Sequence, residues 1–245
     1  PASRGAGLSA QMQDCLHRLL AFLEALTSIG SARAKPVFMP TQALRLLATA
    51  MGDSELAGIP SLILSLLLPP DAPLTRGEAT PLRDLPQEAW LETILCLKIL
   101  NNVARLDLRL LQAGLGKSTV VMEFHHALTL LLMHVSASIN LPKPPQGLDE
   151  MLAELLLLIG YFCLQNVANQ ESLHWGRAPT PLQRLCALPF RYFSDPRCKT
   201  MLFPTLVAAS ADSEANRAVI EEEVSSALLV SYIKEELRTR EAPAA

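Results

Sequence analysis

The stretch Gly114–Thr119 (Gly-Leu-Gly-Lys-Ser-Thr) is a first candidate for chemistry, because it resembles the end of a phosphate-binding P-loop. A complete P-loop reads G-x-x-x-x-G-K-[ST] and follows a β-strand that aims the loop. Leu111 occupies the position of the first glycine, and the preceding residues have a helical pattern. We therefore expect the two glycines to end one helix and Ser118 or Thr119 to cap the next, without nucleotide binding.

A second possible chemistry is metal binding by the histidines of residues 123–134. Glu123 and His126 form an ExxH pair, with His125 adjacent and His134 two turns later. Zinc needs three or four converging ligands, and the cysteine spacings supply none. We therefore expect no metal and no other cofactor, with the histidine nitrogens facing water or backbone.

Residues for nucleophilic catalysis are not arranged in a familiar way. The chain has no GxSxG motif, and Cys163, Cys186 and Cys198 have no histidine at a suggestive spacing. We therefore expect no catalytic residues, no small-molecule substrate and no enzymatic activity. The alternative is an enzyme whose pocket is lined by Glu123, His125 and His134.

Positive charge is concentrated in residues 172–200, which we call the basic segment. Its cations are Arg177, Arg184, Arg191, Arg197 and Lys199, and its one acid is Asp195. The local net charge of +4 opposes the net charge of −3 of the whole chain, as expected for a surface that binds phosphate or an acidic partner. The aromatic residues Trp175, Phe190, Tyr192 and Phe193 are interleaved. Alternatively, these aromatics are core and the arginines form a solvated rim that pairs with Glu221–Glu223.

The composition predicts the elements that must position these residues. Half of the 245 residues are apolar, with 48 leucines against 19 valines and isoleucines, which favours helices and excludes disorder. No apolar run reaches the roughly 18 residues of a membrane span, so we expect no membrane insertion. Five scattered cysteines indicate reduced core thiols in a cytosolic protein. The chain begins at Pro1, and we expect it to be a fragment of a longer protein.

Leucine periodicity predicts helices almost from end to end. They are expected near 8–29, 41–50 (capped by Thr41), 59–68, 87–104, 106–114, 118–136, 149–165, 168–175, 180–188, 197–211, 213–222 and 224–238. The five prolines of residues 69–86 predict a loop, and residues 239–245 a frayed tail. We expect one α-helical domain over residues 1–245; the alternative is two domains divided at 69–86.

Three segments share a helix, a break containing Asn or Asp, and a short amphipathic helix. Anchored on Asp107, Asn169 and Asn216, they are 62 and 47 residues apart. The second interval is near the period of armadillo and HEAT units, whose helix pairs bury their apolar faces by stacking on one another. We therefore predict an all-α, armadillo/HEAT-like repeat array (an α-α superhelix), with an irregular helical bundle as the alternative.

A longer run of residues resembles a known family. It includes Leu158–Phe162, Asn169-Gln170, Gly176-Arg177 and the block Leu182–Leu206, with Tyr192–Arg197 inside it. These residues resemble the C-terminal domain of the family of S-phase cyclin A-associated proteins of the endoplasmic reticulum, and the segment around Leu100–Asn102 is similar too. The resemblance implies the same armadillo-like fold.

The resemblance also implies a function as an adaptor in tubulin autoregulation. Such an adaptor docks on translating ribosomes, through ribosomal RNA, beside a tetratricopeptide-repeat protein that reads nascent tubulin, and recruits the Ccr–Not deadenylase to tubulin mRNA. It implies a cytoplasmic, ribosome-associated location, including the cytosolic face of the endoplasmic reticulum, with cyclin A bound by other parts of the full-length protein. The alternative is a cyclin A–kinase anchoring module. Its candidate docking motifs are Arg45-Leu-Leu and Arg109-Leu-Leu, both of which we expect to be buried in amphipathic helices and not to bind cyclin A.

Overall fold

The computed structural model describes residues 10–30, 46, 49–50, 58–68, 85–139, 141–189, 191–194, 196–224, 230 and 233–234. All regular structure within these ranges is helical, which confirms the predicted all-α class. Thr41, most of the predicted loop at 69–86, most of the helix expected at 224–238 and the tail at 239–245 lie outside the described residues.

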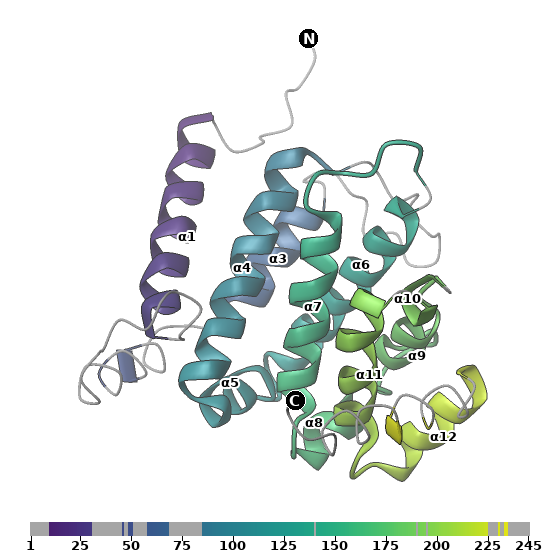
Figure 1. Cartoon of the computed structure of the whole chain (residues 1–245). Coiled ribbons are helices and arrows are strands. Elements are labelled where there is room, and N and C mark those ends of the chain that lie inside the picture. Colours follow the sequence, from purple (N-terminus) through teal and green to yellow (C-terminus); the bar gives the residue numbers. More distant parts are fainter. Residues whose placement is uncertain are drawn as a thin grey trace, which may run out of the picture.

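Four long helices lie side by side in one layer (Figure 1). They are α1 (Ala10–Gly30), α4 (Gln87–Leu106), α7 (Leu148–Cys163) and α11 (Pro196–Ser210). Leucines occupy the contacts between neighbours, and Leu97, Leu155 and Leu206 are completely buried. Full burial of one such side chain is worth about 1.5–3 kcal/mol, so this layer supplies much of the core.

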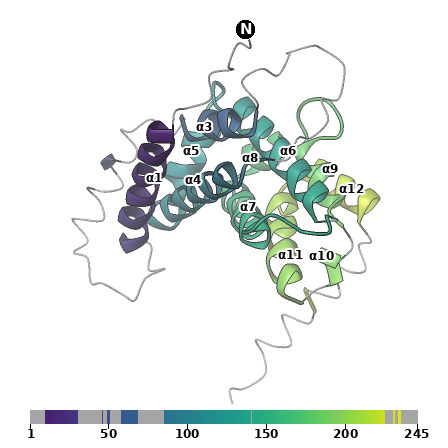
Figure 2. The same ribbon diagram turned by 90° about the horizontal axis from the view of Figure 1, so that it is seen from above.

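A second layer covers one face of the first, as seen from above in Figure 2. It consists of α3 (Gly58–Leu67), α6 (Val121–Ser138) and α9 (Pro181–Cys186). Helix α6 packs against α3 and α9 within the layer and against α7 in the other layer. Helix α3 also contacts α4, so helices from both sides of the proline-rich residues 69–86 pack together.

The glycines that resemble a P-loop lie at a helix end, as predicted. Helix α5 (Leu108–Leu115) includes Gly114 and has Gly116 as its C-cap. The predicted capping of the next helix by Ser118 or Thr119 is wrong. Helix α6 begins at Val121 after Val120, and no side chain caps it. The turn at residues 117–120 is closed instead by backbone hydrogen bonds from Val120 and Val121 to the carbonyl of Lys117.

Each of α4, α7 and α11 ends at a break that is followed by a short helix. The short helices are α5, α8 (Val167–Ser172) and α12 (Glu214–Glu223). Their N-caps are Asp107, Asn166 and Ser213, whose side-chain oxygens accept from the backbone N–H three residues later. Asp107 is therefore equivalent to Asn166, and the predicted pairing with Asn169 is wrong by three residues. The corrected intervals are 59 and 47 residues.

Two buried carboxamides join successive units in the same way. Asn169 Nδ2 donates to the carbonyl of Phe162, seven residues earlier, at 2.9 Å and to that of Gln112, on α5, at 3.5 Å. Asn216 Nδ2 donates to the carbonyl of Ala209, also seven residues earlier, at 2.7 Å and to that of Gln170, on α8, at 2.6 Å. Each carboxamide thus ties a short helix to the end of its own long helix and to the preceding short helix.

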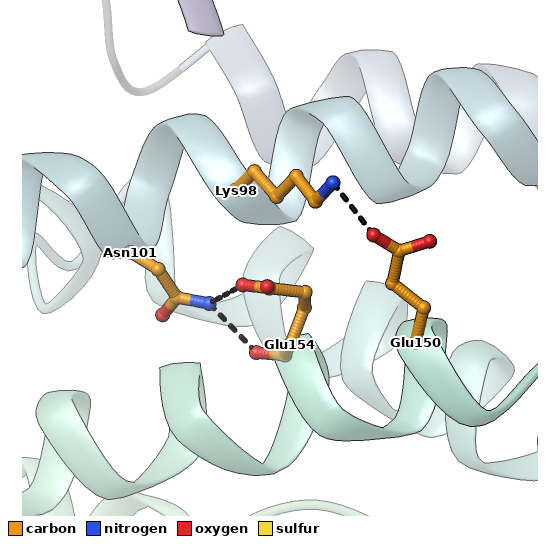
Figure 3. Close-up of polar contacts among 4 residues, drawn as sticks. All are labelled: Lys98, Asn101, Glu150 and Glu154. Carbon is orange, nitrogen blue, oxygen red and sulfur yellow. Dashed lines mark hydrogen bonds and ion pairs between the residues drawn. The ribbon is translucent and has the colours of Figure 1, made fainter. Parts of the chain in front are cut away.

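Polar contacts also join the long helices, as Figure 3 shows for α4 and α7. Asn101 Nδ2 donates to Glu154 Oε2 at 2.8 Å and to the Glu154 carbonyl at 2.9 Å, and Lys98 Nζ lies 2.6 Å from Glu150 Oε1. On the opposite side of α4, the adjacent Asn102 donates to Thr27 Oγ1 of α1 at 3.2 Å. The Asn101–Asn102 pair therefore connects α4 to both of its neighbours in the layer.

Replacement of Asn216 by alanine is expected to lower the free energy of unfolding by about 2–4 kcal/mol, because two buried carbonyls lose their donor. Urea denaturation followed by circular dichroism measures this loss. Glu214→Ala, an exposed change in the same helix, is the matched control and should shift the free energy by less than about 0.5 kcal/mol. Equal stability of the two variants would contradict the role assigned to the Asn216 carboxamide.

Candidate binding surface

The first cation of the basic segment, Arg177, lies in the loop of residues 173–180, between α8 and α9. Leu182 N–H donates to the carbonyl of the buried Leu173 at 3.2 Å, so the two ends of the loop are joined. Thr180 caps α9 in a capping box: its hydroxyl accepts from Gln183 N–H, and Gln183 Oε1 accepts from Thr180 N–H. Pro181 suits the first position of the helix, where its missing N–H has no cost.

The five predicted cations lie on successive elements of this region. Arg177 is exposed in the loop, Arg184 is half-buried on α9, and Lys199 is half-buried on α11. Arg191 begins α10 (Arg191–Ser194), and Arg197 lies in the first turn of α11; their side chains lie outside the described part. The binding role of all five residues stays a prediction.

Arg184 is the most unusual of the described cations. Its Nε is buried and has no hydrogen-bond partner. Burial lowers the pKa of the guanidinium below its usual value. No ion pair with Glu221–Glu223 or another described acid compensates for this desolvation. Because the buried Nε is out of reach of an incoming anion, only the part of the half-buried guanidinium that faces solvent could bind a carboxylate or phosphate.

The interleaved aromatic residues divide between core and surface. Tyr192 is buried, and Phe193 is half-buried with its ring centroid 6.3 Å from that of Phe203. Trp175, in contrast, is 48% exposed, whereas Phe190 is not among the described residues. The core alternative therefore holds for Tyr192, and the surface interpretation holds for Trp175. The adjacent Gly176 has φ +98°, a left-handed conformation that glycine adopts without strain.

His125 is a core residue, so the prediction that its nitrogens face water or backbone is wrong. Its Nε2 lies 3.2 Å from Ser172 Oγ, which itself donates to the carbonyl of Asn169 at 2.7 Å. Ser172 Oγ therefore accepts from Nε2–H, and Nδ1 stays unprotonated. Nδ1 is buried without a partner, and burial lowers the pKa of His125 to about 4. Burial also lowers the pKa of His134.

The acidic residues and histidines that were considered as metal ligands do not converge, because their side chains contact different residues or solvent. Ser61 Oγ donates to Glu123, and His126 is exposed. The sequence also contains a second ExxH pair, Glu171 and His174, but His174 Nδ1 lies 3.0 Å from Asn216 Oδ1. Within the described ranges, no three His, Cys, Asp or Glu side chains converge as a metal site would require.

Three of the five predicted core cysteines are buried, whereas Cys198 is half-buried and the prediction is wrong for the exposed Cys15. Burial raises the pKa of the Cys96 and Cys186 thiols to about 12 and also raises that of Cys163. These three thiols are therefore protonated at neutral pH, whereas a catalytic cysteine needs a thiolate.

One of the two candidate cyclin-docking motifs lies inside an amphipathic helix, as expected. In Arg109-Leu-Leu, the arginine is exposed on α5, but Leu111 is buried in the core. This leucine cannot enter a partner's pocket while α5 is folded. The other motif, Arg45-Leu-Leu, is not covered, apart from Leu46, by the described residues.

The fold and the surface define an all-α protein segment with a basic, partly aromatic region near the end of its helical layers. No family model matches the chain. Over 193 residues, 79% of its length, it is 32% identical to the S phase cyclin A-associated protein in the endoplasmic reticulum from Homo sapiens. The chain is homologous to a segment of that protein, which confirms the predicted resemblance. The match spans about 13% of the length of the human relative. Among the described helices, none is both long and apolar enough to cross a membrane.

Buried His125 is expected to make stability pH-dependent. Its pKa is about 4 in the folded state and 6.5 for the ordinary side chain, so between these values the unfolded state binds more protons. His125 should therefore cost about 3 kcal/mol of stability as the pH falls from 7 to 4. Urea denaturation at several pH values measures this loss.

His125→Gln should flatten this pH dependence, because glutamine keeps an N–H donor for Ser172 and does not titrate. His126→Gln, at the exposed neighbouring position, is the control and should keep most of the wild-type slope. Identical slopes for the wild type and His125→Gln would contradict the buried neutral state of His125.

Proposed function

We propose that the chain is a non-enzymatic adaptor, an armadillo/HEAT-like array whose basic segment docks on the ribosome. Support for the array comes from the two helical layers and from the capped break and short helix that occur three times. Support for docking comes from Arg177 and Arg184, which have no acidic partner among the described residues. A stack of helix pairs displays a rigid surface on which such cations keep fixed positions.

The observation that carries the proposal is a stretch of the sequence that contains arginines and no acidic residue. Between Ser172 and Ser194 the sequence contains three arginines and no Asp or Glu, although the whole chain carries a net charge of −3. Cations gathered against the overall sign favour a polyanion such as ribosomal RNA.

The identity of the specific protein partners is proposed from the family resemblance. In this proposal the adaptor binds beside the tetratricopeptide-repeat reader of nascent tubulin and helps to recruit the Ccr–Not deadenylase, so that tubulin mRNA decays. It works in the cytoplasm on ribosomes, including those at the endoplasmic reticulum. The name of the human relative associates that whole protein with cyclin A. Because Leu111 is buried, we expect this chain alone not to capture cyclin A in a pull-down assay.

Co-sedimentation with ribosomes tests the proposal. If the five cations each meet a phosphate, the logarithm of the affinity falls with the logarithm of the salt concentration at a slope of roughly −3.5 to −4.5. Arg177→Glu and Arg184→Glu should each weaken pelleting, and each should make this slope shallower by about 0.7–0.9.

Arg109→Glu is the matched control, because Arg109 is an exposed arginine on α5, outside the basic segment. It should leave pelleting and its salt dependence unchanged. Wild-type pelleting that neither substitution in the basic segment reduces would assign the ribosome contact to another surface. Absence of wild-type pelleting would reject ribosome docking by this chain.

A further inference from the structure

Trp175 stands out among the exposed apolar residues of the described part. It is 48% exposed, whereas Trp90, the other tryptophan of the chain, is 2% exposed in α4. Single exposed apolar residues are common on protein surfaces, so exposure alone says little. Trp175 differs because it lies two residues before the exposed Arg177, in a loop that is firmly held.

The backbone on both sides of Trp175 is anchored to the core. Trp175 N–H donates to the carbonyl of Ser172 at 3.0 Å, and the preceding His174 contacts Asn216 through its ring. After Arg177, the capping box of Thr180 and the hydrogen bond from Leu182 to Leu173 hold the chain. A residue displayed in this way loses little backbone freedom when it binds a ligand, which favours affinity.

The charge around the loop selects the class of ligand. The loop itself has no acid, Arg177 is exposed, and Arg184 lies half-buried on the following helix. An indole offers a flat π-face on which any unpaired base can stack, and guanidinium groups bind phosphate oxygens. An acidic peptide would use the cations but not the indole face. The combination therefore favours unpaired nucleotides over a carboxylate partner.

We propose that the loop of residues 173–180 binds single-stranded RNA, with Trp175 stacked on an unpaired base and Arg177 on an adjacent phosphate. This inference rests on the proposed docking on the ribosome, where it assigns the contact to exposed, unpaired rRNA nucleotides. Duplex RNA is a poor ligand for such a loop, because its bases are already stacked and its major groove is too narrow for side chains.

Tryptophan fluorescence tests the proposal on the 245-residue chain. Titration with a single-stranded oligouridine should quench the solvent-exposed Trp175 and leave the buried Trp90 unaffected. Trp175→Phe should abolish the quenching, because only Trp90 remains. A blunt duplex of the same length should quench much less than the single strand. Equal quenching by duplex and single strand, or no saturable quenching, would overturn the proposal.

Affinity measurements separate stacking from charge. By fluorescence anisotropy of labelled oligouridine, Trp175→Ala should bind at least about fivefold more weakly, while Trp175→Phe keeps most of the affinity. Arg177→Gln should weaken binding and make the salt slope shallower by about 0.7. Val167→Ala, which truncates an apolar side chain with 45% exposure on α8, is the control and should bind like the wild type.

Ribosome pelleting of Trp175→Ala distinguishes this inference from the proposed function. Weaker pelleting together with weaker oligouridine binding supports both. Unchanged pelleting of this variant overturns the loop contact but leaves ribosome docking standing. If Trp175→Ala loses pelleting while the wild type does not bind oligouridine, the loop contacts a ribosomal protein and the RNA proposal is overturned.

Discussion

Buried carboxamides that satisfy the carbonyls at helix ends are the constraint on which this structure depends. A helix leaves its last carbonyls without intrahelical donors, and a buried carbonyl without a donor costs about 1–3 kcal/mol. Asn169 and Asn216 supply donors to Phe162 and Ala209 at the ends of α7 and α11. Gln170, completely buried, adds a third tie: it donates to the carbonyl of Cys163 and accepts from Asp212 N–H. Apolar contacts hold the layers together, whereas these amides fix the position of each short helix.

The same amides fix the position of the candidate binding surface. Asn216 donates to the carbonyl of Gln170 with its nitrogen and contacts His174 with its oxygen. Asn216 thus joins α12 to α8 and to the residue before Trp175. A loop that protruded freely would lose conformational entropy on binding, whereas this one is ordered by the core before any partner arrives. The contacts of Asn216 that hold α12 against α8 therefore also hold the backbone next to the exposed Trp175.

Leucine periodicity was enough to predict nearly every described helix, because burial of one face dominates helix formation. The alignment of the three breaks was harder to predict. Asp107, Asn166 and Asn169 are all short polar residues near a helix start, yet the first two cap the backbone while Asn169 reaches across to the preceding short helix. Residue type alone does not separate the two roles, since the difference lies in tertiary contacts. The core position of His125, against Ser172, escaped prediction for the same reason.

For the candidate surface too, the sequence predicts some properties, while others depend on tertiary contacts. Net charge is a property of the sequence, so the basic segment was visible at once. The exposure of a side chain cannot be read from the sequence in this way, because residues of similar type differ. Tyr192 is buried, whereas Trp175 is exposed. Arg184 is half-buried, whereas Arg177 is exposed. This difference implies two kinds of cation. An exposed arginine attracts a polyanion at a distance that salt screens, whereas a partly desolvated one gains most from a close, directional hydrogen bond. In the proposed docking on the ribosome, Arg177 would therefore act mainly during encounter and Arg184 in the docked complex.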